Sequence, residues 1–165
     1  MAARKNKPKK KTETPGGGKN ISENRKARHK FEIIEQIECG IVLQGSEVKS
    51  LRDGKISLDE AYVRVQDGAL FLISADIAEY KQATMWNHEP RRPRKLLVHR
   101  AQLNKLTQRA FEKGLTLIPL RIYFNARGIV KLMVGVGRGK KLHDKRDAMK
   151  KADVKRQIDR AMRKR

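Results

Sequence analysis

The sequence predicts a mainly β protein with short helices, and three features support that prediction. About six short apolar or alternating segments are separated by Gly, Pro, Asn and Asp, as strands and their turns are. Helical segments are inserted among these strands without alternating with them one for one, which argues against a doubly wound parallel sheet. The stretch between the basic ends is long enough for one hydrophobic core, so we expect a single domain.

The net charge of +22 is concentrated in the two ends of the chain. Residues 1–30 hold 11 Lys and Arg against 2 Asp and Glu, residues 138–165 hold 13 against 4, and residues 31–136 hold 16 against 12. Ends this polar cannot bury a core, but they can become ordered against a polyanion such as RNA. We expect a disordered basic arm over 1–20, a folded body over 21–137, and a basic tail from residue 138 that is disordered in the free protein.

Residues 31–54 are predicted to form a strand followed by a short helix. Residues 31–37 are rich in β-branched and aromatic side chains, which favours a strand. We expect Gly40 to break this strand and residues 41–43 to resume it. A short helix fits between Ser46, which can cap its first turn, and Gly54, which can end it.

A hairpin is the clearest local signal. The apolar runs 61–66 and 69–73 flank Asp67-Gly68, a pair that favours the positive φ angles of a tight turn. Residues 76–80 are predicted to form an edge strand. Residues 89–95 are predicted to be an exposed loop, because two prolines prevent a regular ladder of hydrogen bonds.

The second half of the chain contains a helix and then strands. Apolar residues on one face predict a helix over 100–113, with Gly114 as its stop. Residues 125–128 are predicted to make a second hairpin turn, and the glycine-rich residues 135–139 to form a flexible hinge. The strands predicted here cover residues 115–118, 120–124 and 129–134.

These elements fit a closed antiparallel β-barrel most simply. Closure removes exposed sheet edges and suits a body of this length, and an OB-fold-like barrel is our first choice among such folds. That fold often holds nucleic acid on one face of its strands and on the adjoining loops.

The chemistry of the sequence points to binding and not to catalysis. We find no P-loop, no paired carboxylates and no nucleophile triad. The single cysteine, Cys39, excludes an internal disulfide and a cysteine-rich metal site, and the four histidines are scattered, so we expect no metal and no cofactor. No apolar run approaches the roughly 20 residues that cross a bilayer, and no secretory signal is present, so we expect a cytoplasmic monomer that does not bind membranes.

Several residues are candidates for RNA contact, each with a plainer alternative. The basic cluster at 24–29 can pair with phosphates or stack on a base, or it can be a solvated linker. Glu38 can accept hydrogen bonds from a nucleobase or form an ordinary ion pair. Leu97 reads as a core residue from its local sequence. His143, between cations, can stack on a base.

Five blocks together resemble the small protein B (SmpB) family, the bacterial tmRNA-binding proteins of trans-translation. They keep their order along most of the chain, which is more specific than any one of them. The matching blocks are residues 24–29, 38–55, 94–99, 114–120 and 139–146.

The resemblance implies an OB-type barrel that binds the tRNA-like domain of tmRNA. It also implies delivery of alanine-charged tmRNA to ribosomes stalled on messages that lack a stop codon. Asn24, Glu38 and Leu97 match tmRNA-binding positions of the family, which changes our interpretation of Leu97 from core residue to contact. The tmRNA-binding residues that we predict are Asn24, Arg25, Arg28, Glu38, Lys95 and Leu97.

The same resemblance assigns the tail to the ribosome. It implies that the tail enters the decoding centre of the small subunit, folds as a helix in the empty mRNA channel, and replaces codon–anticodon pairing, with His143 stacking on a ribosomal RNA base. The residues that match this segment are Lys140, Lys141, His143, Asp144, Lys145 and Arg146. The family often has alanine where this chain has Cys39.

Two other functions remain open on sequence alone. A structural ribosomal protein could anchor to ribosomal RNA through both basic ends. A nuclease could use His143 or His29, although neither has visible catalytic partners.

Overall fold

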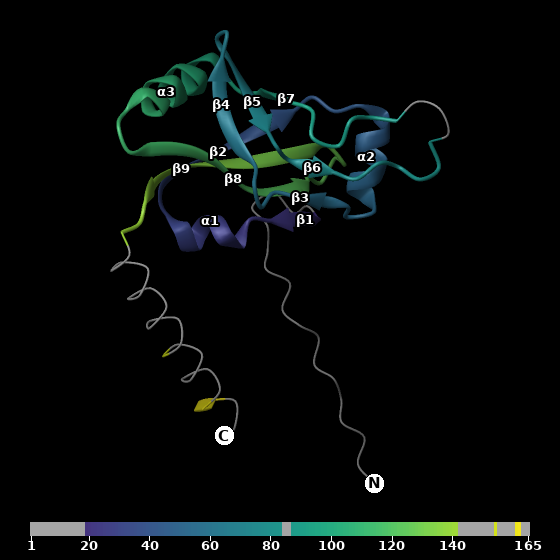
Figure 1. Ribbon diagram of the computed structural model, residues 1–165, viewed down its shortest axis with the longest axis horizontal. Coiled ribbons are helices and arrows are strands. Elements are labelled where there is room, and N and C mark those ends of the chain that lie inside the picture. Colours follow the sequence, from purple (N-terminus) through teal and green to yellow (C-terminus); the bar gives the residue numbers. More distant parts are fainter. Residues whose placement is uncertain (1–18, 84–86, 142–153, 155–160, 163–165) are drawn as a thin grey trace.

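The computed structural model describes residues 19–83 and 87–141, together with Val154 and residues 161–162. It confirms a mainly β chain with short helices (Figure 1). The helices are α1 (Arg25–Lys30), α2 (Gly45–Arg52) and α3 (Arg100–Phe111). The strands are β1 (Asn20–Glu23), β2 (Phe31–Ile41), β3 (Ile56–Ser57), β4 (Tyr62–Gln66), β5 (Ala69–Ile73), β6 (Asp76–Ile77), β7 (Arg94–Leu97), β8 (Leu115–Phe124) and β9 (Val130–Gly139).

The larger sheet closes on itself. Its strand order is β1-β8-β4-β5-β7-β2-β9, and β8 also pairs with β9, so the strands from β8 round to β9 form a ring (Figure 1). All of its pairings are antiparallel. In this ring β2 and β4 are three places apart, which puts them on opposite sides. β3 and β6 pair separately as a two-stranded sheet.

The main core lies inside the ring. Alternate residues of each strand point inward, so that Leu70 and Leu72 of β5 are fully buried while the residues between and beside them are only partly covered. β4 and β8 share one pair, Val63 with Leu117. α3 packs beside that point and buries Leu106.

A second apolar cluster lies on the outside of the ring, beneath α1. Ala27 of α1 packs against Ile118 and Leu120 of β8, with partly buried side chains from β2 and β9 around them. The middle of β8 is therefore covered on both faces, which explains its nearly unbroken apolar sequence. α1 is held against the outer face of β8, β9 and β2 (Figure 1).

The prediction of a hinge at residues 135–139 is wrong, because these residues belong to β9: residues 135–138 pair with both β2 and β8, and Gly139 pairs with β2. The glycines serve packing. A Cβ at Gly135 would lie 2.9 Å from Leu120 Cδ1, and one at Gly137 would lie 2.9 Å from Ile118 Cδ1. Their bare backbone leaves room for the cluster beneath α1.

Replacing Gly137 by valine is expected to lower the free energy of unfolding by about 1–3 kcal/mol, because the new side chain overpacks this cluster. Gly139→Val is the matched control, since nothing lies within 4 Å of a Cβ there. Urea denaturation of both variants measures the difference. Equal midpoints for the two variants would show that the glycine is not needed for packing.

Of the predicted turns and strand breaks, the Asp67-Gly68 turn is confirmed, whereas two predicted strand breaks are wrong. Asp67 and Gly68 have φ angles of 50° and 66°, which confirms the tight hairpin between β4 and β5. Gly40 does not break a strand: β2 continues through it, and Gly40 pairs with Leu97. The predicted strands 115–118 and 120–124 form one strand, β8, whose register with β9 shifts just after Pro119.

The short helix was predicted nearly correctly, but its cap was not. Gln44 occupies the N-cap position of α2, and its backbone N–H donates to Glu47 Oε2 at 2.6 Å. Ser46 lies inside the helix, so its predicted capping role is wrong. Gly54, with φ of 74°, ends the turn as expected.

Two further predicted elements, a helix and an edge strand, are present but shorter than predicted. The helix predicted at 100–113 is confirmed as α3, which ends two residues earlier, and Gly114 has a φ of 84°. The edge strand at 76–80 is reduced to β6. β1 and α1 had no predicted counterpart, because their short, polar sequences lack the periodicity that marks a strand or a helix.

Candidate nucleic-acid interface

Glu38 lies at the centre of a polar cluster on the outer face of β2, β9 and β8. Its Oε1 is 3.2 Å from Lys131 Nζ on β9, and its Oε2 accepts a hydrogen bond from the Tyr123 hydroxyl on β8. Register places Glu38 in one row with Met133 and Arg121, and Lys131 and Tyr123 opposite each other in the neighbouring row, so Glu38 reaches its two partners diagonally across three strands. The Glu38 side chain is still 45% exposed.

This arrangement keeps Glu38 ionised. The pKa of the Glu38 carboxyl is lower than usual, chiefly because Tyr123 donates to it, with partial burial acting in the opposite direction and Lys131 adding to the lowering. Burial, and then the bond to Glu38, raise the pKa of Tyr123 to about 12. An oriented, partly exposed carboxylate can accept further hydrogen bonds from the edge of a nucleobase.

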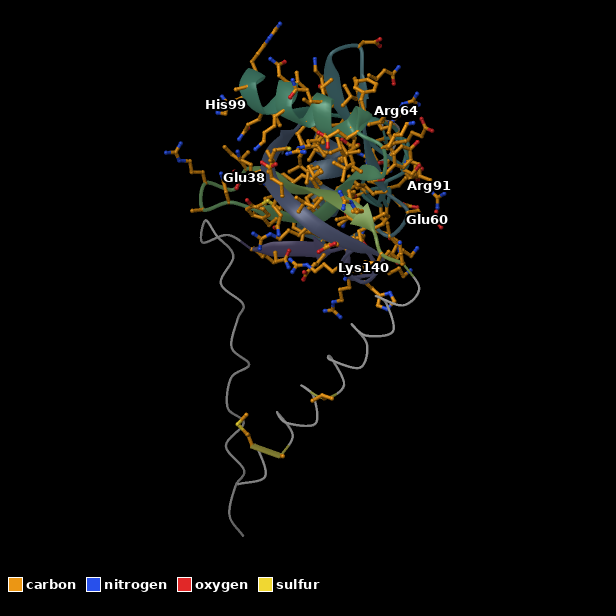
Figure 2. All side chains as sticks on the ribbon, turned by 90° about the vertical axis from the view of Figure 1, so that its left-hand side faces the viewer. Glu38, Glu60, Arg64, Arg91, His99 and Lys140 are labelled. Atoms are coloured by element: carbon orange, nitrogen blue, oxygen red, sulfur yellow. The ribbon has the colours of Figure 1, made fainter. Side chains whose placement is uncertain are left out.

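A hollow of about 580 Å³ opens beside Glu38. It joins the last residues of β2 to the end of β7, the start of α3 and the β8–β9 turn. Leu97 points outward there and is 53% exposed, although its neighbour Leu96 is buried in the main core. The residues that line it are Glu38, Gly40, Ile41, Leu97, Val98, His99, Gln102, Ile129, Val130 and Lys131. Figure 2 shows Glu38 and His99 on the same side of the body.

Gly40 and the β8–β9 turn shape this hollow. A Cβ at Gly40 would lie 3.3 Å from the Leu97 Cβ, so the glycine lets β7 and its leucine come close to β2. In the turn, the Asn125 side chain accepts from the backbone N–H of Arg127 and of Ile129. That confirms the turn predicted at 125–128 and holds Ile129 at the rim of the hollow.

Asn24 is a buried residue that organises α1. Its side chain Oδ1 accepts from the backbone N–H of Ala27 at 2.9 Å, and its Nδ2 donates to the Leu58 carbonyl at 2.9 Å. Only 3% of the residue is exposed. The exposed cations Arg25 and Arg28 project from the helix that it caps. The basic cluster predicted at 24–29 is therefore a helix packed on the body and not a linker.

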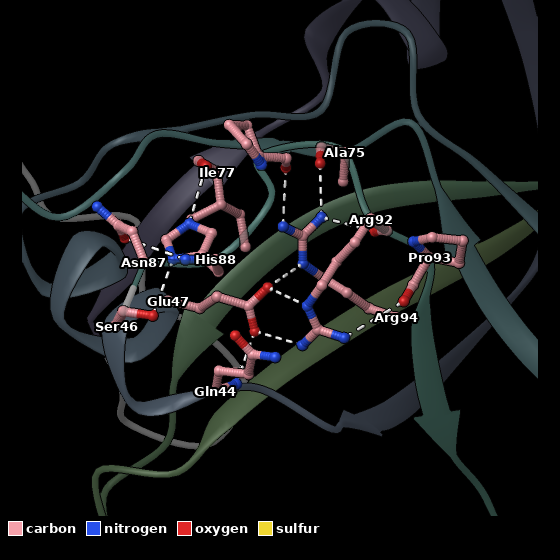
Figure 3. A network of polar contacts seen from close by, with 11 residues as sticks. Gln44, Ser46, Glu47, Ala75, Ile77, Asn87, His88, Arg92, Pro93 and Arg94 are labelled. Carbon is pink, nitrogen blue, oxygen red and sulfur yellow. Dashed lines mark hydrogen bonds and ion pairs between the residues drawn. The ribbon is translucent and has the colours of Figure 1, made fainter. Parts of the chain in front are cut away.

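The loop before β7 is anchored by buried charge, which sequence reasoning missed (Figure 3). Arg94 and Glu47 are both fully buried and are joined by a 2.8 Å contact from Nε to Oε1, while Arg92 Nη2 lies 2.6 Å from Glu47 Oε2. Arg94 also donates to the carbonyls of Ala75 and Pro90, at 2.6 and 2.8 Å. The prediction that residues 89–95 form an exposed loop is therefore wrong for Arg94, and Arg94 and Lys95 begin β7.

A histidine closes the same network. His88 is buried, with Nδ1 3.0 Å from Ser46 Oγ and Nε2 3.1 Å from the Ile77 carbonyl. Together with the Glu47 contacts it ties the loop to α2 and β6 (Figure 3). This fixes the position of β7, so that Leu96 points into the core while Lys95 and Leu97 point outward.

The start of the tail is attached to α1. The Lys140 backbone N–H donates to the Lys30 carbonyl at 3.0 Å, and Lys140 Nζ donates to the Arg28 carbonyl at 3.1 Å. Lys141 is exposed. The other tail residues predicted to contact the ribosome, His143, Asp144, Lys145 and Arg146, lie outside the described residues.

The tail leaves the body far from the hollow. Phe31 of β2 pairs with Gly139, the last residue of β9, whereas Glu38 pairs with Met133. Seven residues of strand at about 3.3 Å each separate the two points by roughly 23 Å. Of the predicted site residues, the structure brings Glu38 and Leu97 together at the hollow and Arg25, Arg28 and Lys140 together around α1. Lys95 lies beyond Leu97 on the outer face of β7.

Lys131, Tyr123 and Gln102 were not singled out from the sequence. Lys131 is a cation within an apolar strand, which is a weak signal for an outward, functional position. The sequence offers no signal that Tyr123 reaches Glu38, because that contact depends on the pairing of β8 and β2 with β9.

The described residues form neither a membrane-spanning helix nor a cluster of metal ligands. None of the helices there is both long and apolar enough to cross a membrane. Nor do three or more His, Cys, Asp or Glu side chains converge within 19–83 and 87–141 in a way that could hold a metal ion.

Comparison with known sequences gives a consistent result. Residues 21–164 match the model of a family described as "SmpB protein". An SsrA-binding protein of Rhodopirellula baltica is 58% identical over 143 residues, which cover 87% of this chain and 81% of the relative. An SsrA-binding protein of Rhodopseudomonas palustris (strain BisB18) is 53% identical over 143 residues, covering 87% and 91%.

A solved structure described as "tmRNA-SmpB: a journey to the center of the bacterial ribosome" contains a similar chain. The two superpose with a TM-score of 0.63 at 50% sequence identity, over 73% of this chain and 85% of the other.

Proposed function

This chain belongs to the SmpB family, and on that premise we propose that it binds the tRNA-like domain of tmRNA and delivers tmRNA to stalled ribosomes for trans-translation. The observation that carries the proposal is the hollow beside Glu38. Glu38 and Leu97 are distant in sequence, yet both line it, and basic α1 packs on the same outer face of the ring. A polar acceptor, an apolar contact and a set of cations are the groups that recognise a folded RNA.

Each predicted residue has a distinct role in this proposal. Glu38 accepts hydrogen bonds from a base edge, and Leu97 packs on a base or sugar in the hollow. Arg25 and Arg28 pair with phosphates. Asn24 acts indirectly, by holding α1 in place. Lys95 adds a cation at the margin of the interface, beyond Leu97.

The organisation of the chain belongs to the same proposal. The closed ring with α3 inserted beside the single β4–β8 pair is consistent with an OB-type barrel over residues 21–137. Asn20 already pairs within β1, and Arg138 and Gly139 still belong to β9, so the proposed arm ends before Asn20 and the proposed tail begins at Lys140. The protein acts in the cytoplasm by binding RNA, and no catalytic residue is assigned.

The tail provides the second half of the mechanism. Lys140, Lys141, His143, Asp144, Lys145 and Arg146 enter the decoding centre of the small subunit, with His143 stacked on a ribosomal RNA base. The remaining tail orders only in an mRNA channel that is empty, since ordering costs entropy that contacts with RNA must offset. The length of β2 that separates the tail from the hollow, roughly 23 Å, lets the body hold one RNA while the tail engages another.

Sequencing the RNA that copurifies with the full-length protein tests this function. Enrichment of a single tmRNA is expected. Stoichiometric recovery with one ribosomal subunit, and a broad spread of ribosomal RNA, would instead indicate a structural ribosomal protein.

Leu97→Ser is expected to weaken binding of the tRNA-like domain roughly 5- to 30-fold, the equivalent of losing about 1–2 kcal/mol of apolar contact. Ile34→Ser is the matched control, because Ile34 is a β2 residue that is 55% exposed and does not line the hollow. Gel-shift titration compares the two. The role of Leu97 is wrong if both variants bind like the unaltered protein or weaken equally.

A further inference from the structure

Tyr123 is a buried tyrosine on the outer face of the ring. It follows Ile122, which belongs to the main core, so the Tyr123 side chain lies on the opposite side of β8. None of the residue is exposed. The Arg121 guanidinium lies over its ring, 5.2 Å from the centroid, and Asn20 of β1 pairs with Tyr123 on the edge of β8 away from β9. The ring is therefore held in place by its surroundings.

The hydroxyl of this ring connects β8 to β2. It donates to Glu38 Oε2, and the contact passes over β9, which lies between the two strands. A buried phenol needs a hydrogen-bond partner, and Glu38 supplies it. Because a packed tyrosine side chain has only two torsion angles, its hydroxyl oxygen occupies one place and fixes one oxygen of the carboxylate there.

Lys131 is a less restrictive partner of the same carboxylate. Its Nζ reaches Glu38 Oε1 at 3.2 Å, but it does so through a long flexible side chain that is 28% exposed. Each carboxylate oxygen has two lone pairs, so both oxygens can accept a further hydrogen bond. Glu38 lines the hollow, where such a donor can reach it. The orientation of the carboxylate thus depends chiefly on Tyr123, and Lys131 adds charge.

The contact also determines the charge of Glu38. The groups that face its carboxyl come from three places: Tyr123 and Arg121 on β8, Lys131 on β9, and His99, which precedes α3 and lines the same hollow. Donation by Tyr123 is the largest cause that lowers the pKa of Glu38, with smaller contributions from Lys131 and Arg121 and an opposing effect of partial burial. Phosphates of a bound RNA would raise this pKa, and a protonated carboxyl presents a donor in place of an acceptor.

We propose that Tyr123 is a positioning residue for tmRNA recognition, whose hydroxyl holds the Glu38 carboxylate in one orientation as an acceptor for the edge of a nucleobase. Preorganising a binding group in this way raises affinity because less entropy is lost on binding. Tyr123 acts through Glu38 and does not touch the RNA itself, since it is fully buried. The inference rests on the proposed function, because it takes Glu38 as a residue that binds tmRNA.

The test uses Tyr123→Phe in the full-length protein, which removes the hydroxyl and keeps the ring. Tyr80→Phe is the matched control, because it makes the same chemical change at a half-buried tyrosine that does not line the hollow. Glu38→Ala and the combination of Glu38→Ala with Tyr123→Phe complete a double-mutant cycle. Gel-shift titration over a range of pH measures affinity for the tRNA-like domain, and urea denaturation verifies folding.

Tyr123→Phe is expected to weaken binding of the tRNA-like domain roughly 2- to 12-fold, the equivalent of one hydrogen bond. In the Glu38→Ala background it should have no further effect. The affinity of Tyr123→Phe should also be lost at a higher pH on acidification, because removing the largest cause of the lowered pKa makes Glu38 protonate sooner. A purely structural role of Tyr123 would instead weaken binding in both backgrounds and leave the pH profile unmoved.

Titration of Glu38 in the free protein gives a check that does not depend on any variant being folded. Carboxyl ¹³C NMR of the glutamate-labelled, unaltered protein should show a pKa below the ordinary value, with the resonance assigned by its absence in Glu38→Ala. An ordinary pKa there would overturn the inference.

Two other results would overturn it. One is equal affinity of Tyr123→Phe and Tyr80→Phe, and the other is a further loss when Tyr123→Phe is added to Glu38→Ala. If Glu38→Ala itself binds the tRNA-like domain as tightly as the unaltered protein, the role of Glu38 in the proposed function is rejected. The failure of the premise is thereby distinguished from the failure of the inference.

Discussion

A chain that ends at Lys141 is expected to bind tmRNA as tightly as the full-length protein and to lose tagging of stalled peptides almost completely. The truncation keeps both Lys140 contacts with α1, so the interface at Glu38 and α1 is undisturbed. It removes His143, Asp144, Lys145 and Arg146, which are proposed to occupy the decoding centre. The body would still bring tmRNA to the ribosome. Without the tail, however, nothing would replace the missing codon–anticodon pairing in the decoding centre.

Gel-shift titration with the tRNA-like domain and tagging of a peptide from a message without a stop codon measure the two activities. A full-length chain with residues 142–165 in scrambled order is the matched control, since it keeps the charge and length of the tail. Full tagging by the scrambled chain would show that only charge matters and would reject the individual residue assignments. Tagging by the truncated chain would reject the role of the tail altogether.

Arg94→Met is expected to lower the free energy of unfolding by about 3–5 kcal/mol, as removing one partner of a buried ion pair does. Glu47 is fully buried and would keep only Arg92, a more exposed partner, and the Gln44 backbone N–H. The Ala75 carbonyl would also lose its Arg94 donor, and the Pro90 carbonyl would keep only the Ile77 backbone N–H. Arg91→Met, on the same loop, is the control: its ion pairs with Asp76 and Glu60 are exposed, so we expect a change below about 1 kcal/mol.

The same network predicts a dependence of stability on pH. Burial alone would raise the pKa of Glu47, but hydrogen bonds from Arg92, the Gln44 backbone and Arg94 outweigh it and leave the pKa below its usual value. A depressed pKa in the folded state adds stability that is present above the unfolded pKa of about 4.3 and is lost as pH falls through the folded pKa. Glu47→Gln should remove this component, so its stability should change less on acidification.

Urea denaturation of the unaltered protein and the three variants between neutral and acidic pH measures both effects. Similar midpoints for Arg94→Met and Arg91→Met would mean that the buried pair is not an anchor. Because the network positions β7, Arg94→Met should also weaken tRNA-like domain binding in proportion to the disorder it introduces at Leu97.

Local signals were sufficient where neighbouring residues decide the structure. The Asp67-Gly68 turn needs two positive φ angles, and the sequence there supplies residues that adopt them. α3 was predicted from its apolar face and Gly114. The basic ends were evident from composition alone, and the assignment of Glu38 followed from the family resemblance before its hydrogen-bond partners were known.

Predictions from local sequence were wrong where a residue distant in sequence determines the burial or the conformation of the residue concerned. The Pro- and Arg-rich segment around Arg94 predicts an exposed side chain. In the structure Arg94 is buried, because Glu47, which is distant in sequence, forms an ion pair with it. The glycines Gly135 and Gly137 predict a flexible segment. In the structure the side chains of Leu120 and Ile118 occupy the space where their Cβ atoms would lie. Leu97 reads as a core residue, because a two-residue leucine run does not reveal which of the pair faces inward.

The sequence by itself determined the class of fold, the positions of most turns and strands, the separation of a nearly balanced body from two cationic ends, and RNA as the partner. These properties depend on composition and on periodicities of a few residues. Only the tertiary structure decided that Glu38, Lys131 and Leu97 meet at one hollow, that the tail starts far from it, and that Tyr123 reaches Glu38 across β9. Those juxtapositions follow from strand pairing around a closed ring, and pairing joins residues whose separation along the chain leaves no local trace.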